Sequence, residues 1–310
     1  MNRTVFISCI LLVLLSSCGT YTTFYGETVQ DTTVDEHTRR LDLSYQNLTE
    51  LPLAYDTLHS LRMLDLSGNV DLDISHVLAS ITYPEEIDVL ILDSLNLKEI
   101  PPELKRYTHL KQLSLGYNPR LDIEKTIASL EGTSLEFLNL RGNEIIEIPQ
   151  NIETLQTLKD LNLSYNHIHD EASYQYLGAL PKLFSLWIDH NELTVLPTTI
   201  GGLSQLRYFY IDHNKLTTLP SEISGMERVW TIHAGHNRFT ELPIELMGVP
   251  KLILVHMNNN RIASISRNYG EKKYSMKALL LDHNPLPKEE RLWAEKAFKN
   301  FFLLSFKQTF

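Results

Sequence analysis

From Leu41 onward the chain repeats one spacing of apolar and polar residues. A leucine, two variable residues, a leucine, one variable residue and another leucine precede an asparagine, as in LKQLSLGYN at 110–118 and LEFLNLRGN at 135–143. The alternation in L-x-L predicts a short strand whose leucines share one face. Each of these leucines contributes roughly 1.5–3 kcal/mol when it is buried. One coil cannot bury them alone, so the pattern predicts many stacked coils around a continuous core.

The polar position that ends each strand recurs every 23 to 26 residues along the chain. It falls at Gln46, Asn69, Leu95, Asn118, Asn143, Asn166, Asn191, Asn214, Asn237, Asn260 and Asn284. The frame L-x-x-L-x-L-x-x-N-x-L resembles the leucine-rich-repeat family. The resemblance implies an α/β solenoid of about 11 repeats, curved as a horseshoe, with a parallel β-sheet on its concave face. It also implies a ladder of asparagine side chains bonded to the backbone of adjacent coils, which we expect Leu95 to interrupt.

The segments between strands are of two kinds. Residues 148–158, 196–206 and 219–229 begin with Ile-Pro or Leu-Pro and continue with apolar residues three apart. This pattern predicts a short helix or 3₁₀ turn on the convex face. The longer repeats at 73–81, 122–130 and 170–180 lack the proline and are expected to be more fully helical.

We place the repeat array at residues 38–287 and a C-terminal capping helix at 288–310. Glu289 and Glu290 would lie in the first turn of this helix, where the helix dipole favours acidic side chains. Trp293, Ala297 and Phe301 recur at helical spacing and are expected to form its buried stripe.

The N-terminus has the pattern of an export signal. The apolar run from Val5 to Leu15 is shorter than the roughly 20 residues that cross a bilayer as a helix, and it matches the apolar region of a secretory signal. The following Leu-Ser-Ser-Cys resembles the lipobox of bacterial lipoproteins. That resemblance implies a signal peptide at 1–17, a lipid on Cys18 and a threonine-rich tether through residue 37. The only other cysteine, Cys9, would be removed, so no disulfide is expected.

A lipid on Cys18 implies a protein anchored at the bacterial cell envelope, at the outer membrane or cell surface rather than at the inner membrane. The alternative is a buried first helix with an incidental Cys18, which would make the protein an intracellular scaffold. Replacing Cys18 by alanine separates these two interpretations.

The composition argues against several functions. A formal net charge of −10 disfavours nucleic acid as a partner, because phosphate binding needs clustered lysine and arginine. The motifs G-x-S-x-G, H-E-x-x-H, the phosphate loop and C-x-x-C do not occur in the sequence. The face of a solenoid offers few deep pockets for catalysis. We therefore expect a monomeric, non-catalytic protein without a cofactor.

The expected concave face changes character along the chain. The solvent-facing position between the two strand leucines is small and polar in the first repeats. In later repeats it carries an aromatic and histidine column on four consecutive strands, about 4.8 Å apart. Its members are Trp187, Tyr210, His233 and His256, flanked by Tyr208 on one side and by Asp189 and Asp212 on the other, with His190, His213, His236 and His283 in a further outer column. Solvent-facing aromatic residues in polar surroundings favour a binding surface for a protein, peptide or glycan.

Two other interpretations of these residues remain open. Neighbouring aromatic side chains stabilise each other by roughly 0.2–1 kcal/mol per pair, which would suit a passive structural or adhesive protein. Exposed rings at Trp187 and Tyr210 would favour binding, and rings covered by the chain itself would favour the structural role. Histidine and aspartate could also ligate Zn²⁺. Because the repeat aligns them in a row rather than around a point, no metal site is expected.

The histidines of this face also predict a dependence on pH. Several imidazoles facing one concavity would gain charge below pH ~6.5. We therefore expect binding at this surface to differ between mildly acidic and neutral pH.

Overall fold

The computed structural model describes residues 34–51 and 58–307. The predicted signal peptide, Cys18 and the tether up to residue 33 lie outside the described residues. The described chain divides into two compact units. Unit 1 comprises the described residues up to Leu95 together with Pro101–Ser114, and unit 2 comprises Asn96–Ile100 and the residues from Leu115 onward.

Unit 1 is a stack of short parallel strands with helical turns between them. Its strands pair in chain order and are β1 (Arg40–Asp42), β2 (Met63–Asp65), β3 (Val89–Ile91) and β4 (Gln112–Ser114). The connecting segments contain α2 (Ile74–Ser80) and the 3₁₀ turns η2 (Pro84–Glu86) and η3 (Pro102–Arg106). Asp73 caps α2 by accepting a hydrogen bond from the backbone N–H of His76. The central leucine of β2 and that of β3 are fully buried, as the L-x-L alternation predicts.

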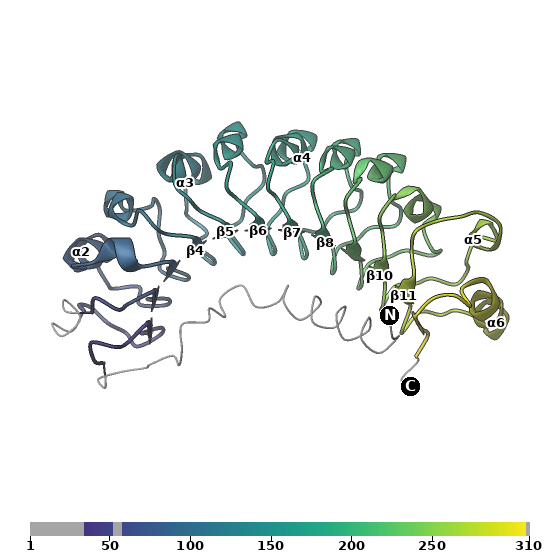
Figure 1. The fold of residues 1–310 in the computed structure, drawn as a ribbon, viewed down its shortest axis with the longest axis horizontal. Coiled ribbons are helices and arrows are strands. Elements are labelled where there is room, and N and C mark those ends of the chain that lie inside the picture. Colours follow the sequence, from purple (N-terminus) through teal and green to yellow (C-terminus); the bar gives the residue numbers. More distant parts are fainter. Residues whose placement is uncertain (1–33, 52–57, 308–310) are drawn as a thin grey trace. The chain divides into compact units, whose positions relative to one another are not determined.

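Unit 2 continues the same pattern over more coils. Its parallel strands are β5 (Phe137–Asn139), β6 (Asp160–Asn162), β7 (Ser185–Trp187), β8 (Tyr208–Tyr210), β9 (Thr231–His233), β10 (Leu254–His256), β11 (Ala278–Leu280) and β12 (Leu303–Ser305). They pair in chain order. Within this unit the strands lie along the inner side of a curved stack and the helices lie along its outer side (Figure 1).

The two kinds of outer segment form as the sequence predicts. The segments that begin with proline contain the 3₁₀ turns η4 (Gln150–Thr154), η5 (Thr198–Gly202), η6 (Ser221–Gly225) and η7 (Ile244–Gly248). The longer repeats contain α-helices, which are α2 in unit 1 and α3 (Ile123–Leu130) and α4 (Glu171–Gly178) in unit 2. Asp122 and Asp170 cap α3 and α4 at their N-termini. A further short helix, α5 (Asn268–Glu271), precedes β11.

Buried asparagine side chains hold successive coils of unit 2 together. The Asn214 amide nitrogen donates to the carbonyls of Ile188 and Ile211, at 3.0 and 3.1 Å. Its Oδ1 accepts from the backbone N–H groups of Asn191 and Leu193, at 2.9 and 3.0 Å. The side chain thus satisfies backbone groups in a turn where no strand partner is available. The equivalent asparagines at 143, 166, 191, 237, 260 and 284 make the same kinds of bond.

Leu95 departs from this ladder. Its apolar side chain is buried, with 5% of its surface exposed, and it offers no amide to the neighbouring backbone. Asn96–Ile100, which follows it, groups with unit 2, whereas Pro101–Ser114 groups with unit 1 again. Within Asn96–Ile100 the Leu97 N–H donates to Oδ1 of Asn118. Leu95 therefore contributes no side-chain hydrogen bond to the ladder, as its apolar side chain predicts.

The C-terminal cap differs from the prediction. The helix α6 (Lys288–Ala297) is shorter than the expected 288–310, and the chain then adds β12, which pairs with β11. The residues buried at the cap are Ala294 and Phe298 rather than Trp293, Ala297 and Phe301. Because the helix ends at Ala297, Phe298 turns inward and packs against Tyr269 at a ring-centroid distance of 5.7 Å. The cap is thus a helix followed by an edge strand.

Among residues 34–51 and 58–307, no helix combines the length and the apolar character needed to cross a membrane.

Replacing Asn214 by alanine is expected to lower the free energy of unfolding by about 3 kcal/mol, because it leaves several buried backbone groups without partners. Urea denaturation of the variant and the parent protein measures this difference. The matched control is Asn151→Ala on the outer side, which removes one exposed hydrogen bond to the Glu124 carbonyl. An equal effect of the two substitutions would contradict a structural role for the ladder.

Candidate functional site

The inner face of unit 2 carries the aromatic and histidine column that the sequence predicts. Trp187, Tyr210, His233 and His256 each end a strand, and the parallel register places them opposite one another. Trp187 and Tyr210 stack with centroids 5.1 Å apart and planes within 7°. Tyr210 and His233 stack at 4.7 Å, and His256 meets His233 edge-on at 5.2 Å. We call these four residues the inner column.

Stacking within the inner column limits what a ligand can touch. Tyr210 is only 8% exposed, because Trp187 and His233 cover the two faces of its ring. Trp187, His233 and His256 are half-buried. The covered ring of Tyr210 matches the structural interpretation, and the partly open ring of Trp187 matches the binding interpretation. Both faces of the Tyr210 ring are therefore closed to a ligand.

Tyr208 does not belong to the exposed surface on which the sequence analysis placed it. Its side chain is 4% exposed and packs against Phe184 at 5.2 Å and against Trp230 at 6.4 Å. Phe184 directly precedes β7, and Trp230 directly precedes β9. Both rings contact Tyr208, which is the first residue of β8. Tyr208 therefore contributes to packing at the start of β8.

A second row of rings lies where the strands turn outward, at the position before each ladder asparagine. It consists of Tyr165, His190, His213 and His236, and we call it the ring row. Its centroids are 3.9, 4.2 and 4.0 Å apart, with planes within 11° of parallel. The Arg141 guanidinium lies 4.3 Å from the Tyr165 ring centroid and extends the row toward Tyr117 at 5.6 Å.

The backbone explains why these side chains stand in register. Tyr117 and every residue of the ring row have φ between 52° and 57°, in the left-handed region. That conformation usually favours glycine or asparagine, and Asn259 occupies the same position in a later repeat. One identical turn per coil therefore directs each ring the same way. The sequence pattern indicated His190, His213 and His236 as one column. Tyr117 and Tyr165 were not predicted to extend it, although each is an aromatic residue directly before a ladder asparagine.

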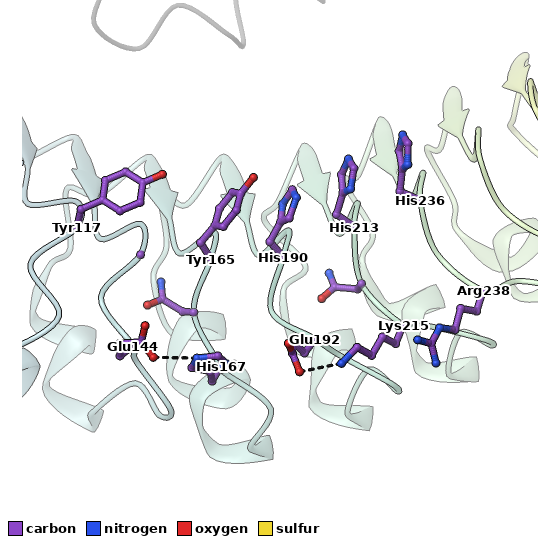
Figure 2. A pocket seen from close by; sticks show the side chains of 13 residues that line it. Tyr117, Glu144, Tyr165, His167, His190, Glu192, His213, Lys215, His236 and Arg238 are labelled. Carbon is purple, nitrogen blue, oxygen red and sulfur yellow. Dashed lines mark hydrogen bonds and ion pairs between the residues drawn. The ribbon is translucent and has the colours of Figure 1, made fainter.

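The ring row forms one side of a groove of ≈ 630 Å³. The other side consists of the residues that follow the ladder asparagines, which we call the charged row: Glu144, His167, Glu192, Lys215 and Arg238 (Figure 2). Glu144 pairs with His167 at 3.0 Å, and Glu192 pairs with Lys215 at 2.8 Å. Exposed pairs of this kind contribute little to stability, so they can exchange partners at small cost.

Comparison with known proteins identifies the repeat. Models of the leucine-rich repeat match residues 134–155, 154–172 and 181–239, all of them within unit 2. An internalin of Listeria monocytogenes is similar in structure, with a TM-score of 0.52, 18% identity, and coverage of 86% of this chain and 83% of that chain. The fold is a leucine-rich-repeat solenoid.

Other comparisons add little to this solenoid assignment. A leucine-rich-repeat protein of Leptospira interrogans has a TM-score of 0.42 and 21% identity, with coverage of 86% of this chain and 95% of that chain. No curated protein is significantly similar to the chain in sequence.

Four histidines of this face have a pKa below the usual value for histidine. Burial lowers the pKa of His233 to about 4, and the neighbouring His256 adds to the effect. Burial also lowers the pKa of His256, and partial burial together with neighbouring histidines lowers the pKa of His213 and that of His236. These four imidazoles therefore gain charge at a more acidic pH than the expected ~6.5.

Two aspartates beside the inner column differ in their partners. Asp189 bonds the Nδ1 of His190 in the ring row at 3.0 Å and accepts from the hydroxyl of Ser164. Asp212 accepts from the backbone N–H of Gly235 at 2.7 Å. Burial raises the pKa of Asp212 to about 7, and the charge of Asp189 adds to the increase.

The raised pKa of Asp212 predicts a dependence of stability on pH. A carboxyl whose pKa is raised on folding stabilises the fold below its unfolded value, and this contribution is lost as the pH rises through the folded value. Asp212→Asn keeps the acceptor for Gly235 and removes the charge. The variant should therefore gain on the order of 2–3 kcal/mol more in free energy of unfolding at pH 8 than at pH 5, where the folded carboxyl is still protonated. Denaturation at both pH values in EDTA measures this, and an equal gain at the two would contradict it.

Proposed function

We propose that this solenoid binds a polypeptide segment in the groove of unit 2 and that a lipid on Cys18 anchors it to the bacterial envelope. Leucine-rich-repeat solenoids are typically protein-binding modules with extended binding surfaces. The observation that supports this site is the ring row, a partly exposed stack of four parallel rings beside a row of charges.

The ring row is suited to tight association because it is already ordered. Binding normally costs roughly 0.5–1.5 kcal/mol for each long side chain that becomes immobilised. Here the rings hold one another in place, and Tyr165 still has 40% of its surface exposed. Rigid, partly exposed aromatic residues are frequent hot spots of protein interfaces. A ligand that contacts the ring row therefore does not have to order these side chains, because folding has already fixed them.

The charges of the groove favour a polypeptide over a glycan. Glu192 and Lys215 lie opposite the ring row and can exchange their mutual ion pair for charged groups of a peptide. A sugar, in contrast, needs free ring faces on which to stack. Those of Tyr210 are covered by Trp187 and His233, and those of His213 are covered by His190 and His236. An extended peptide can instead contact the ring edges along several coils.

The envelope anchor rests on the apolar run from Val5 to Leu15 and the lipobox-like Leu-Ser-Ser-Cys that follows it. Both lie outside the described residues. Tethered in this way, the solenoid would present its groove at the outer membrane or cell surface without any transmembrane helix. Non-catalytic recognition fits a groove whose rings and ion pairs are open to solvent.

The site is tested by arraying the purified protein against envelope proteins, host surface proteins and glycans, and by repeating each hit with two groove variants. Tyr165→Asn and His213→Asn remove rings but suit the left-handed backbone, since Asn259 occupies the equivalent position. Each variant should weaken binding of a protein hit at least about tenfold, the effect of a hot-spot residue.

The matched control for these variants is Tyr45→Asn in unit 1, which changes the same residue type at the same repeat position. It should leave the affinity unchanged. A loss of affinity in this control alone would move the site to unit 1. Hits confined to glycans would contradict a polypeptide ligand, and the absence of any hit would favour the passive structural role.

The anchor has its own test. Cys18→Ala should abolish incorporation of labelled fatty acid and release the protein from the membrane fraction, because it removes the thiol that the lipid would modify. Cys9→Ser should change neither property, since Cys9 lies inside the predicted signal. Fatty-acid labelling that survives in the Cys18 variant would rule out this anchor.

A further inference from the structure

Three side chains of unit 2 converge at the end of the inner column. They are Asp212, which follows β8, His233 at the end of β9 and His256 at the end of β10. Each offers one ligand atom, and these atoms all lie within 4.8 Å of one another. The sequence analysis expected histidine and aspartate to form a straight row. The structure brings these three together around a point.

The convergence has two physical causes. First, the rings of His233 and His256 are turned 78° to each other, so that their Nδ1 atoms face each other at 3.3 Å. Second, the coil of β9 has Gly235 where the preceding coil has Asp212. A Cβ at Gly235 would lie 3.0 Å from Oδ1 of Asp212. The missing side chain thus leaves room for the carboxylate to lean across to the next coil, where it accepts from the Gly235 N–H.

The spacing suits a tetrahedral metal ion. With Zn–N bonds of roughly 2.0 Å, tetrahedral angles place two ligand nitrogens about 3.3 Å apart, which matches the separation of the two histidine nitrogens. A carboxylate oxygen as third ligand completes a set of two imidazoles and one carboxylate. Imidazole selects zinc and similar transition metals over Mg²⁺ and Ca²⁺, which prefer oxygen ligands.

We propose that Asp212, His233 and His256 form a binding site for Zn²⁺ on the inner face of unit 2. Three protein ligands leave one position of a tetrahedral ion open to water or to a group from a bound molecule. The site is distinct from the groove, whose lining includes His213 and His236 but none of the three ligands. The proposal is therefore independent of the proposed function.

Isothermal titration of the EDTA-stripped protein with ZnCl₂ tests the site directly. One Zn²⁺ should bind per chain, and MgCl₂ should produce no binding heat. His256→Gln and Asp212→Asn should each weaken Zn²⁺ binding at least about tenfold, because each removes one of three ligands. Zn²⁺ should also raise the melting temperature of the parent protein, since it binds the folded state, and should do so much less in these variants.

The matched control is His190→Asn, which removes a histidine of the ring row and places asparagine in the left-handed position that Asn259 also occupies. Its affinity for Zn²⁺ should equal that of the parent protein. If His256→Gln fails to fold, Asp212→Asn carries the test, because its amide oxygen can still accept from Gly235. The proposal is overturned if no Zn²⁺ binds, if both ligand variants bind it as tightly as the parent, or if His190→Asn abolishes binding.

Discussion

The hydrogen bonds of the buried asparagines determine the geometry on which the surface of unit 2 depends. Each asparagine bonds to the backbone of its own coil and of the preceding one, so every coil turns out of its strand at the same point and in the same way. The residue just before it is therefore held in one left-handed conformation, coil after coil. Because strands lie about 4.8 Å apart, aromatic rings and imidazoles at that position in neighbouring coils stack. The alignment of the ring row thus follows from the hydrogen bonds of the buried asparagines.

The same constraint produces two surfaces with different properties. On the strands, bulky neighbours in the inner column cover one another, and Tyr210 loses most of its exposure to Trp187 and His233. At the turns, the chain leaves the sheet, and the rings of the ring row project with their edges exposed beside the charged row (Figure 2). The rings at the turns therefore border the groove, and the cluster of Asp212, His233 and His256 lies at and just beyond the ends of the strands.

Much of the fold could be predicted from the sequence because it follows from local periodicity. The L-x-L alternation located the strands, and the prolines at 149, 197 and 220 located the 3₁₀ turns that follow them. The cap was harder, since helical spacing does not say where a helix ends, and the strand β12 is formed by an apolar run that could also continue a helix. The missing ladder hydrogen bonds at Leu95 could be predicted because an apolar side chain cannot replace an amide.

The candidate site was predictable only in part, for reasons of the same kind. Column membership follows from the repeat, so Trp187, Tyr210, His233 and His256 were placed together correctly. The exposure of a side chain cannot be predicted from its repeat position, as Tyr208 shows, because Phe184 and Trp230 from other coils cover it. The convergence of Asp212, His233 and His256 cannot be predicted from the repeat either. Asp212 approaches the histidines only because Gly235, one repeat later, lacks a side chain.

The central claim, that the groove of unit 2 binds a polypeptide, is tested most directly by hydroxyl-radical footprinting with a polypeptide captured on the array. Oxidation of each side chain is measured by mass spectrometry in the free and the saturated protein. Tyr165 and His213 should become protected several-fold, whereas Tyr83 in unit 1, which is equally exposed at 40%, should be oxidised at an unchanged rate. Protection of Tyr83 with no change at Tyr165 and His213 would contradict the account.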